Sequence, residues 1–241
     1  LYSSQHNDKV YFSSEIRALH KIGIPKALNH SAIPSYLSLR YVPEPETMFE
    51  GVQILPAGNY LTVDQATKQP TPQKWFQINA QKKTYSDPQT ELHQLTRSAI
   101  HTAMISDVPI ALHLSAGIDS SVLLAEIQRS DIPINAITAG FGAHSDEVSE
   151  ASDLCKKYDI PHTAVNLGAT DISSLPRVVS QMELPVGDAL ILAFDRLAEA
   201  TASSGSKVAI GGEGVRHVQA PRLLKIPVCY EEPYALDIKE L

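Results

Sequence analysis

A short run of serine, glycine and aspartate residues is the part of this sequence best suited to chemistry. Residues 113–121 are His-Leu-Ser-Ala-Gly-Ile-Asp-Ser-Ser. Serine hydroxyls and the backbone N–H groups of a tight turn are the donors that a phosphate group needs. The carboxylate of Asp119 would repel a phosphate unless a shared Mg²⁺ binds oxygens of both groups. The run therefore predicts a phosphate site that contains one metal-binding carboxylate.

The segments on either side of the run are expected to position it. Residues 108–114 are an apolar run of strand length, and residues 118–128 have the apolar spacing of a helix. A turn between a strand and a helix directs N–H groups and the positive end of the helix dipole toward one point. An ordinary turn with a serine or aspartate cap has a similar composition, so composition alone does not separate the two interpretations.

The order of the residues favours the phosphate site. Residues 115–121 (SAGIDSS) resemble the pyrophosphate loop of ATP-pyrophosphatases, whose pattern is Ser-Gly-Gly-x-Asp-Ser-Ser. The Gly-Lys-Ser/Thr of a Walker loop is absent, so the resemblance implies an enzyme that splits ATP between its α and β phosphates. Ala116 stands where those proteins usually have glycine, and it would cost about 1 kcal/mol if the loop needs a positive φ there.

Composition and charge limit the class of protein. The chain has 241 residues, of which 43% are hydrophobic, enough for one large domain or two small ones. A formal net charge of −7 argues against a nucleic-acid partner and against an anionic membrane surface. No apolar run approaches the length of a membrane span, and we expect a cytoplasmic protein. Cys155 and Cys229 have no metal-ligand spacing.

Strands and helices alternate in the second half of the chain. After residues 108–114, further apolar runs of strand length occur at 134–141, 162–167 and 207–211. This alternation predicts an α/β fold with a mostly parallel sheet and helices on both faces. Ligands of such sheets bind beyond the carboxyl ends of the strands, so the turn at 114–121 should share one rim with the ends of the other strands.

A polar segment marks a domain boundary, and capping residues mark the starts of two helices. Residues 64–85 are polar and punctuated by proline, and we place a domain boundary there, which gives domains at 1–80 and 81–241. Asp87 and Pro88 predict the cap and the first residue of a helix. Near the start of the chain, the two serines before the helical pattern at residues 15–20 predict a serine N-cap.

The N-terminal domain contains three sequence motifs that are specific to one family. Residues 12–19 (FSSEIRAL), 41–51 (YVPEPETMFEG) and 55–58 (LPAG) resemble the end of the glutaminase domain of glutamine-dependent asparagine synthetases. The resemblance implies that residues 1–80 are the α+β tail of an N-terminal-nucleophile glutaminase domain. The nucleophile of that family is an N-terminal cysteine that would precede Leu1. We therefore expect no glutaminase site in these residues, and we expect that they were cut from something longer.

Motifs of the same family follow in its order through the second half. They are residues 112–121 (LHLSAGIDSS), 138–141 (TAGF), 145–147 (SDE), 183–188 (ELPVGD) and 211–214 (GGEG). The resemblance implies that residues 81–241 are an incomplete ATP-pyrophosphatase, or synthetase, domain with an adenine nucleotide α-hydrolase-like fold.

The resemblance also implies roles for single residues. Asp119 would bind Mg²⁺ and pyrophosphate, and Glu213 would lie near the acyl-adenylate and the incoming nitrogen, so both are candidate catalytic residues. The residues expected to bind ATP are Leu114, Ser115, Gly117, Asp119, Ser120, Ser121, Ala139, Gly211 and Gly212.

The family pattern breaks after Gly214. Asparagine synthetases usually continue with Ala/Gly-Asp-Glu, and that aspartate is their second metal carboxylate, whereas this chain has Val215-Arg216-His217. A cation at Arg216 could bind phosphate but cannot hold Mg²⁺. Either the second metal position is altered in this protein, or the sequence joins segments that are separated in the family. We favour the second explanation.

The chemistry implied by the resemblance is that of an ATP-dependent amide ligase. A carboxylate, aspartate by default, attacks the α-phosphorus of ATP, Mg²⁺ neutralises the departing pyrophosphate, and ammonia from glutamine attacks the acyl-adenylate. Two alternatives stay open: a ligase that closes β-lactam or macrolactam rings, and an inactive nucleotide-binding homologue, which Ala116 and Arg216 favour. The resemblance leaves a homodimer open, and neither nucleic acid nor membrane is an expected partner.

Overall fold

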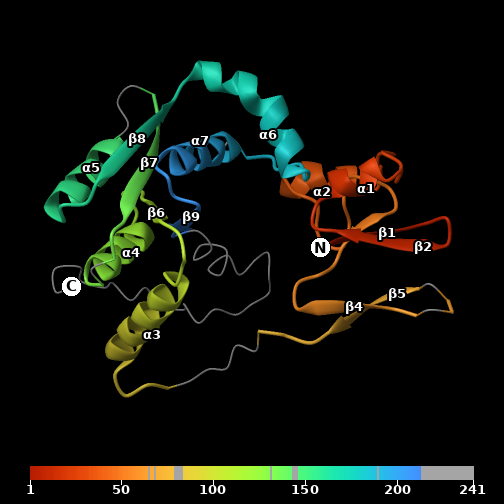
Figure 1. Cartoon of the computed structure of the whole chain (residues 1–241), viewed down its shortest axis with the longest axis horizontal. Helices are drawn as coiled ribbons and strands as arrows, with labels where there is room; N and C mark the ends of the chain where they lie inside the picture. Colours follow the sequence, from red (N-terminus) through yellow and green to blue (C-terminus); the bar gives the residue numbers. More distant parts are fainter. Residues whose placement is uncertain are drawn as a thin grey trace. The chain divides into compact units, whose positions relative to one another are not determined.

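The described residues fall into two units. The computed structural model describes residues 1–64, 66–67, 69–78, 84–130, 132–142, 146–188 and 190–212 (Figure 1). By their contacts, Leu1–Ile78 and Gly168–Asp195 form one unit. The second unit contains the described residues between Asn79 and Leu167 and those from Arg196 to Gly212. A segment from the second half of the sequence thus belongs to the N-terminal unit.

The N-terminal unit contains a small antiparallel sheet with helices beside it. The strand order is β2-β1-β3, with β1 at Tyr2–His6, β2 at Lys9–Ser13 and β3 at Val52–Ile54. A separate antiparallel ribbon is formed by β4 (Asn59–Val63) and β5 (Pro70–Lys74). The helices are α1 (Ile16–Lys21), α2 (Ala32–Leu39), the 3₁₀ helix η1 (Ala169–Ser174) and α6 (Leu175–Met182). The buried side chains of Ile16, Leu19, Ile24 and Val52 form its core.

The second unit is built on a four-stranded parallel sheet of order β8-β7-β6-β9. The strands are β6 (Ile110–His113), β7 (Asn135–Phe141), β8 (His162–Leu167) and β9 (Val208–Gly211). The helices are α3 (Pro88–Ala103), α4 (Ile118–Gln128), α5 (Asp146–Lys157) and the part of α7 (Leu190–Ser203) that follows Asp195. The helix expected at 118–128 and the strand expected at 162–167 are confirmed with the same bounds.

Alternating side chains of this sheet face different helices. Leu112 and Ala136 lie in one buried cluster, which also contains Ile100 of α3, its C-cap residue Met104, Leu124 and Ile127 of α4, and Ala151 and Cys155 of α5. The intervening residues Ala111 and Ile137 lie in another cluster with Leu197 of α7. Because neighbouring residues of a strand point to opposite faces, the two clusters cover opposite faces of the sheet. The predicted parallel sheet with helices on both faces is confirmed.

The start of α3 follows the local sequence pattern. Pro88 occupies the first turn, and the Asp87 carboxylate accepts a hydrogen bond from the backbone N–H of Thr90 at 3.1 Å. Hydrogen bonding to Thr90, first to its side chain and then to its backbone N–H, holds the pKa of Asp87 below its ordinary value. The bond from the Thr90 N–H confirms the predicted cap. The cap could be predicted because its donor and acceptor lie within one helical turn of each other.

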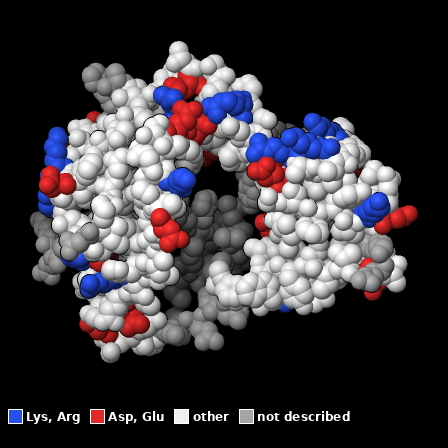
Figure 2. All heavy atoms as spheres, in the orientation of Figure 1, with Lys and Arg blue, Asp and Glu red and all other residues white. Residues whose placement is uncertain are grey.

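Charge is spread over the surface. On the face drawn in Figure 2, basic and acidic side chains lie among many uncharged ones, and both signs occur. In the described ranges, no helix is both long and apolar enough to cross a membrane.

Candidate functional site

The serine-rich loop leaves the sheet at the carboxyl end of β6. The N–H of Leu114 donates to the carbonyl oxygen of Ile137 in β7 at 2.9 Å, and the Leu114 side chain is buried in the sheet core. One residue earlier, His113 pairs with Gly211 at the end of β9. The loop therefore starts from a fixed point between two strand ends.

The buried hydroxyl of Ser120 makes the central hydrogen-bond contacts of the loop. Its side chain is buried, and its Oγ accepts a hydrogen bond from the N–H of Ser115 at 3.1 Å. The same Oγ lies 2.8 Å from the carbonyl oxygen of Ser115 and 3.1 Å from that of Gly117, and it can donate its single proton to one of them. The two hydroxyls of Ser115 and Ser120 lie 2.9 Å apart. The Ser120 hydroxyl thus holds together two ends of the turn.

Two further bonds complete the loop. The N–H of Gly117 donates to the Oγ of Ser115 at 3.2 Å, and the Oγ of Ser121 donates to the carbonyl oxygen of Gly117 at 2.9 Å. Gly117 is the N-cap of α4 with a φ of −70°, so its backbone does not demand glycine. A Cβ at this position would lie 3.1 Å from the Ser115 hydroxyl, which makes the fit tight.

Ala116 occupies the loop without strain. Its φ does not lie in the left-handed region, which in the described chain holds five residues other than glycine: Asn7, Asp8, Arg40, Asp159 and Glu183. The cost considered for an alanine at a positive φ therefore does not arise, and the departure from the family glycine leaves the loop intact.

The first turn of α4 leaves N–H donors for a ligand. Its first helical hydrogen bond runs from the N–H of Ser121 to the carbonyl oxygen of Gly117 at 3.1 Å. The N–H groups of Ile118, Asp119 and Ser120 precede this bond, so the helix itself offers them no acceptor. With the positive end of the helix dipole, such donors form an anion-binding point.

Asp119 lies beside Gly212, at the point where β9 ends. A Cβ built on Gly212 would come within 3.0 Å of the Asp119 Cβ and 3.1 Å of the Ser120 backbone nitrogen. The close approach therefore depends on the missing side chain at Gly212. Asp119 is half-buried, not sealed into the core. The structure brings Asp119, Gly211 and Gly212 together, as the parallel sheet requires.

Ala139 is placed near the same rim by its strand. It follows Ile137, the β7 partner of His113, by two residues, and it packs with Ala111 and Leu197 on the α7 face. Glu213, Gly214, Arg216 and His217 lie outside the described residues, as does Ser145. Their expected roles stay predictions.

Asp119 could hold a metal together with phosphate. No cluster of three or more histidine, cysteine or acidic side chains suited to a metal occurs in the described part of the chain. Mg²⁺ commonly binds proteins through only one or two carboxylates and completes its shell with phosphate and water oxygens. The half-buried carboxylate of Asp119 can supply one such oxygen ligand, and the neighbouring N–H groups that lack helical acceptors could hold the phosphate.

Two partly buried polar contacts were not predicted from the sequence. The Nε2 of His113 lies 2.9 Å from the Oγ1 of Thr201, which donates to the carbonyl oxygen of Leu197 one turn earlier in α7. The Oγ1 of Thr138 lies 2.9 Å from the Nε2 of His162. Burial, and then the positive charge of Lys156, lower the pKa of His162. Only the period-two alternation of the strands could have indicated that these polar residues face inward.

Family comparisons match both halves of the chain. The family described as asparagine synthase matches residues 91–215, and the family described as glutamine amidotransferase domain matches residues 1–76. The asparagine synthetase [glutamine-hydrolyzing] 1 of Bacillus subtilis is 27% identical over 245 residues, covering 98% of this chain and 37% of that protein. A putative asparagine synthetase of Mycobacterium tuberculosis is 27% identical over 222 residues, covering 89% of this chain and 33% of that protein. The chain spans about a third of the length of these curated relatives.

Solved structures resemble the chain only weakly. An NH3-dependent NAD synthetase from Campylobacter jejuni, in complex with nitrate, has a TM-score of 0.35 and 17% identity over 48% of this chain and 53% of its own. A glutamine-dependent NAD+ synthetase from Acinetobacter baumannii, in complex with ADP, has a TM-score of 0.34 and 17% identity over 61% of this chain and 28% of its own. Similarity at this level supports no conclusion about the chain.

Sequence family and geometry agree on the second half of the chain. The matched residues 91–215 make up more than half of the sequence, and they contain the loop after β6, the end of β7 and the end of β9. The chain belongs to the asparagine synthase family.

Proposed function

We propose that the chain is part of an ATP-dependent amide ligase that activates a carboxylate as an acyl-adenylate with release of pyrophosphate. One observation carries the proposal: the first turn of α4 presents N–H groups without helical acceptors beside Asp119 and Gly212. This arrangement suits a phosphate chain and a single Mg²⁺. Membership of the asparagine synthase family supports it.

The proposed roles of the residues follow from their positions. The N–H groups of the first turn of α4, with Ser115, Gly117 and Ser121, would bind the pyrophosphate part of ATP. Ser120 would hold the loop in shape through its buried hydroxyl as well as offering its N–H. Leu114, Ala139, Gly211 and Gly212 would contact the rest of the nucleotide.

The proposed catalytic residues are Asp119 and Glu213. Asp119 would hold Mg²⁺, which when bound supplies positive charge against the departing pyrophosphate. Glu213 would act near the acyl group and the incoming nitrogen. Most of the rate enhancement would come from positioning and from charge stabilisation by fixed groups.

The proposed substrates are aspartate and ammonia released from glutamine. The glutamine amidotransferase match over residues 1–76 supports the nitrogen source, and the names of the bacterial relatives support the acceptor. We propose residue 80 as the boundary between the two functional parts of the sequence. In space, Gly168–Asp195 joins the N-terminal unit.

Exchange of labelled pyrophosphate into ATP tests the proposal directly. The full chain is incubated with ATP, Mg²⁺ and aspartate, and then with other carboxylic acids. We expect exchange with aspartate, and a loss of about a hundredfold or more in Asp119→Asn, the scale typical of removing one preorganised electrostatic group. Asp107→Asn is the matched control, because Asp107 is exposed and precedes β6.

The other outcomes separate the alternatives. Exchange with a different acid would replace aspartate as the substrate and would favour a ring-closing ligase. ATP binding without exchange for any acid would favour an inactive nucleotide-binding homologue and would contradict the ligase proposal. Absence of ATP binding would remove the nucleotide site itself.

A further inference from the structure

One segment is assigned to one part of the molecule by its family match and to the other part by its contacts in the structure. Gly168–Asp195 lies inside the range that matches the asparagine synthase family, residues 91–215. Its contacts nevertheless group it with Leu1–Ile78, the part that contains the glutamine amidotransferase match. The segment follows β8 directly and ends within α7, so the chain continues into the second unit at both of its ends.

A carboxylate of this segment caps helix α1. The Oε2 of Glu183 accepts a hydrogen bond from the N–H of Ile16 at 2.6 Å, and its Oε1 accepts one from the N–H of Arg17 at 2.8 Å. The Glu183 side chain is only 8% exposed. The local N-cap, Glu15, makes no capping bond, because its carboxylate pairs with the Arg17 guanidinium. Glu183 therefore supplies the cap that the local sequence does not.

Two neighbouring residues dock on the same unit. Leu184 packs against the buried cluster that contains Ile16 and Leu19. The N–H of Gly187 donates to the carbonyl oxygen of Arg40 at 2.8 Å, and a Cβ at Gly187 would lie 2.9 Å from the Cβ of Arg40. Residues 183–187 thus attach to this unit by a charged, an apolar and a backbone contact. We refer to them as the anchor.

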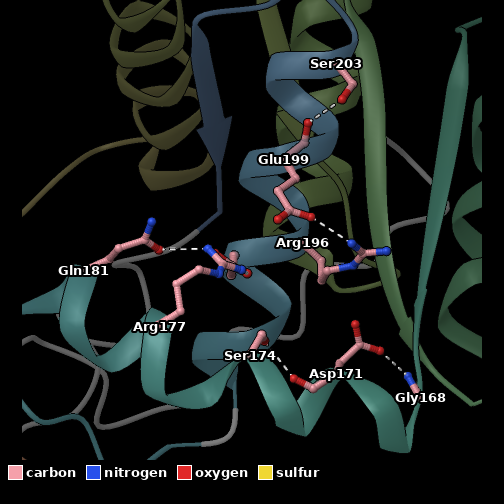
Figure 3. A network of polar contacts seen from close by, with 9 residues as sticks. Gly168, Asp171, Ser174, Arg177, Gln181, Arg196, Glu199 and Ser203 are labelled. Atoms are coloured by element: carbon pink, nitrogen blue, oxygen red, sulfur yellow. Dashed lines mark hydrogen bonds and ion pairs between the residues drawn. The ribbon is translucent and has the colours of Figure 1, made fainter.

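The segment is also tied to the start of α7. The guanidinium of Arg177 on α6 donates to both carboxylate oxygens of Asp195, at 3.1 and 2.6 Å, and to the Oε1 of Gln181 at 3.0 Å. Figure 3 shows Arg177 extended from α6 toward α7, with Gln181 beside it. Asp195 is the last residue of the segment, so this bidentate pair fixes the point at which the chain leaves it.

The last turns of α7 reach the sheet below the loop. Leu197 packs against Ala111 and Ile137, and Thr201 lies in hydrogen-bond distance of His113, the last residue of β6. His113 precedes the loop by one residue. Side-chain contacts therefore tie Glu183 to α1, Arg177 to α7, and α7 to the strand that carries the loop, and the chain of helix α6 connects Arg177 to Glu183.

We propose that the anchor links the N-terminal unit to the ATP loop, with Glu183 as a positioning residue for the proposed reaction and not a catalytic one. Each of its carboxylate oxygens accepts a hydrogen bond from the α1 backbone, and the side chain is buried, which suits a structural contact better than a contact with a substrate. The inference rests on the proposed function in one respect, since it takes the loop after β6 as the ATP site. If two sites are linked through such contacts, binding at one changes the stability of the other.

Hydrogen exchange resolved to short peptides tests the link in the full chain. The amides of Ile16 and Arg17 are followed with and without ATP and Mg²⁺, in the wild type and in Glu183→Gln. An amide side chain offers one oxygen acceptor where the carboxylate offers two. We expect exchange on the order of tenfold faster at these amides in the variant, the equivalent of losing one cap. We also expect ATP to slow exchange there in the wild type and not in the variant.

Two further variants separate positioning from simple stabilisation. Glu50→Gln makes the same change of charge at an exposed residue of the same unit and should behave as wild type. Arg177→Gln breaks the pair with Asp195 and leaves the Glu183 contacts in place. It should keep the slow exchange at Ile16 and Arg17 without ATP but lose the response to ATP.

Several results would overturn the inference. Unchanged exchange at Ile16 and Arg17 in Glu183→Gln would show that the carboxylate does not cap α1 in solution. If ATP binds the wild type but leaves these amides unaffected, the link does not exist. A direct titration of ATP against the wild type identifies the separate case in which the proposed nucleotide site fails, because the capping effect is then still measurable without ATP.

Discussion

The starts of helices α4 and α1 meet the same requirement with partners at very different distances along the chain. Both helices begin with N–H groups that need acceptors. At α4, the groups that shape the start lie within residues 115–121, and Ser120 reaches back only five residues to Ser115. At α1, the acceptor is Glu183, 167 residues away from Ile16.

The difference separates a site open to ligands from a junction between segments. The α4 loop satisfies its own hydroxyls internally and leaves the first-turn N–H groups unused by the helix. At the α1 start, the N–H groups of Ile16 and Arg17 donate to the buried carboxylate of Glu183. A local cap therefore keeps an anion site available, whereas a long-range cap uses up the site to join distant segments.

A side chain added at Gly212 should disturb the α4 start more than any other change proposed here, because Gly212 lies close to Asp119 and Ser120. Gly212→Ala would place a Cβ 3.0 Å from the Asp119 Cβ, so the end of β9 or the start of α4 must move. We expect a loss of about 1–3 kcal/mol in the free energy of unfolding, as for other overpacked sites, together with weaker ATP binding. Denaturant unfolding and an ATP titration measure the two effects.

Gly168→Ala is the matched control for this variant. A Cβ at Gly168 meets no atom within 4 Å, and its φ of −127° suits any residue. If both alanine variants are equally stable and bind ATP equally well, Gly212 is not the residue that permits the approach to Asp119.

Removal of the buried hydroxyl tests the local cap itself. Ser120→Ala deprives the Ser115 N–H of its acceptor and the turn of its central contact. We expect a loss of about 1–2 kcal/mol in the free energy of unfolding, the usual range for a buried donor left without a partner. Ser121→Ala removes a single bond to Gly117 and should cost less. Equal stability of the two variants in urea would contradict a central role for Ser120.

Features that depend on neighbours along the chain could be predicted from the sequence. The strand at 162–167, the helix at 118–128 and the Asp87 cap of α3 match the structure, because each is decided within a few residues. The loop was identified for the same reason. Its family pattern lies in one run, and the parallel sheet then fixes which strand ends lie beside it.

Features set by distant partners could not be predicted. The serines before the first helix predict a serine N-cap, and this prediction is wrong: the N-cap residue is Glu15, and Glu183 accepts the capping bonds. Nothing near α1 in the sequence indicates that a residue so far away will supply the acceptor. Likewise, the pattern of residues 115–121 does not reveal that the Ser120 hydroxyl faces into the loop and not toward solvent.

A pH titration between pH 7.5 and pH 5 tests a contact that lies away from both helix starts. The side-chain bonds described for these two starts come from serine and glutamate, whereas a partly buried histidine contact lies in the sheet, between His162 and Thr138. Burial lowers the pKa of His162, so the unfolded chain binds its proton at a higher pH than the folded chain does. The stabilising contribution of neutral His162 is therefore complete above the ordinary histidine pKa and is lost as the pH falls through and below it.

We expect denaturant unfolding between pH 7.5 and pH 5 to show a smaller loss of stability in His162→Gln than in the wild type. His101→Gln, at an exposed position of α3, should follow the wild type. Parallel curves for the wild type and His162→Gln would mean that the sheet is not the source of the loss of stability and that groups nearer the helix starts must be considered.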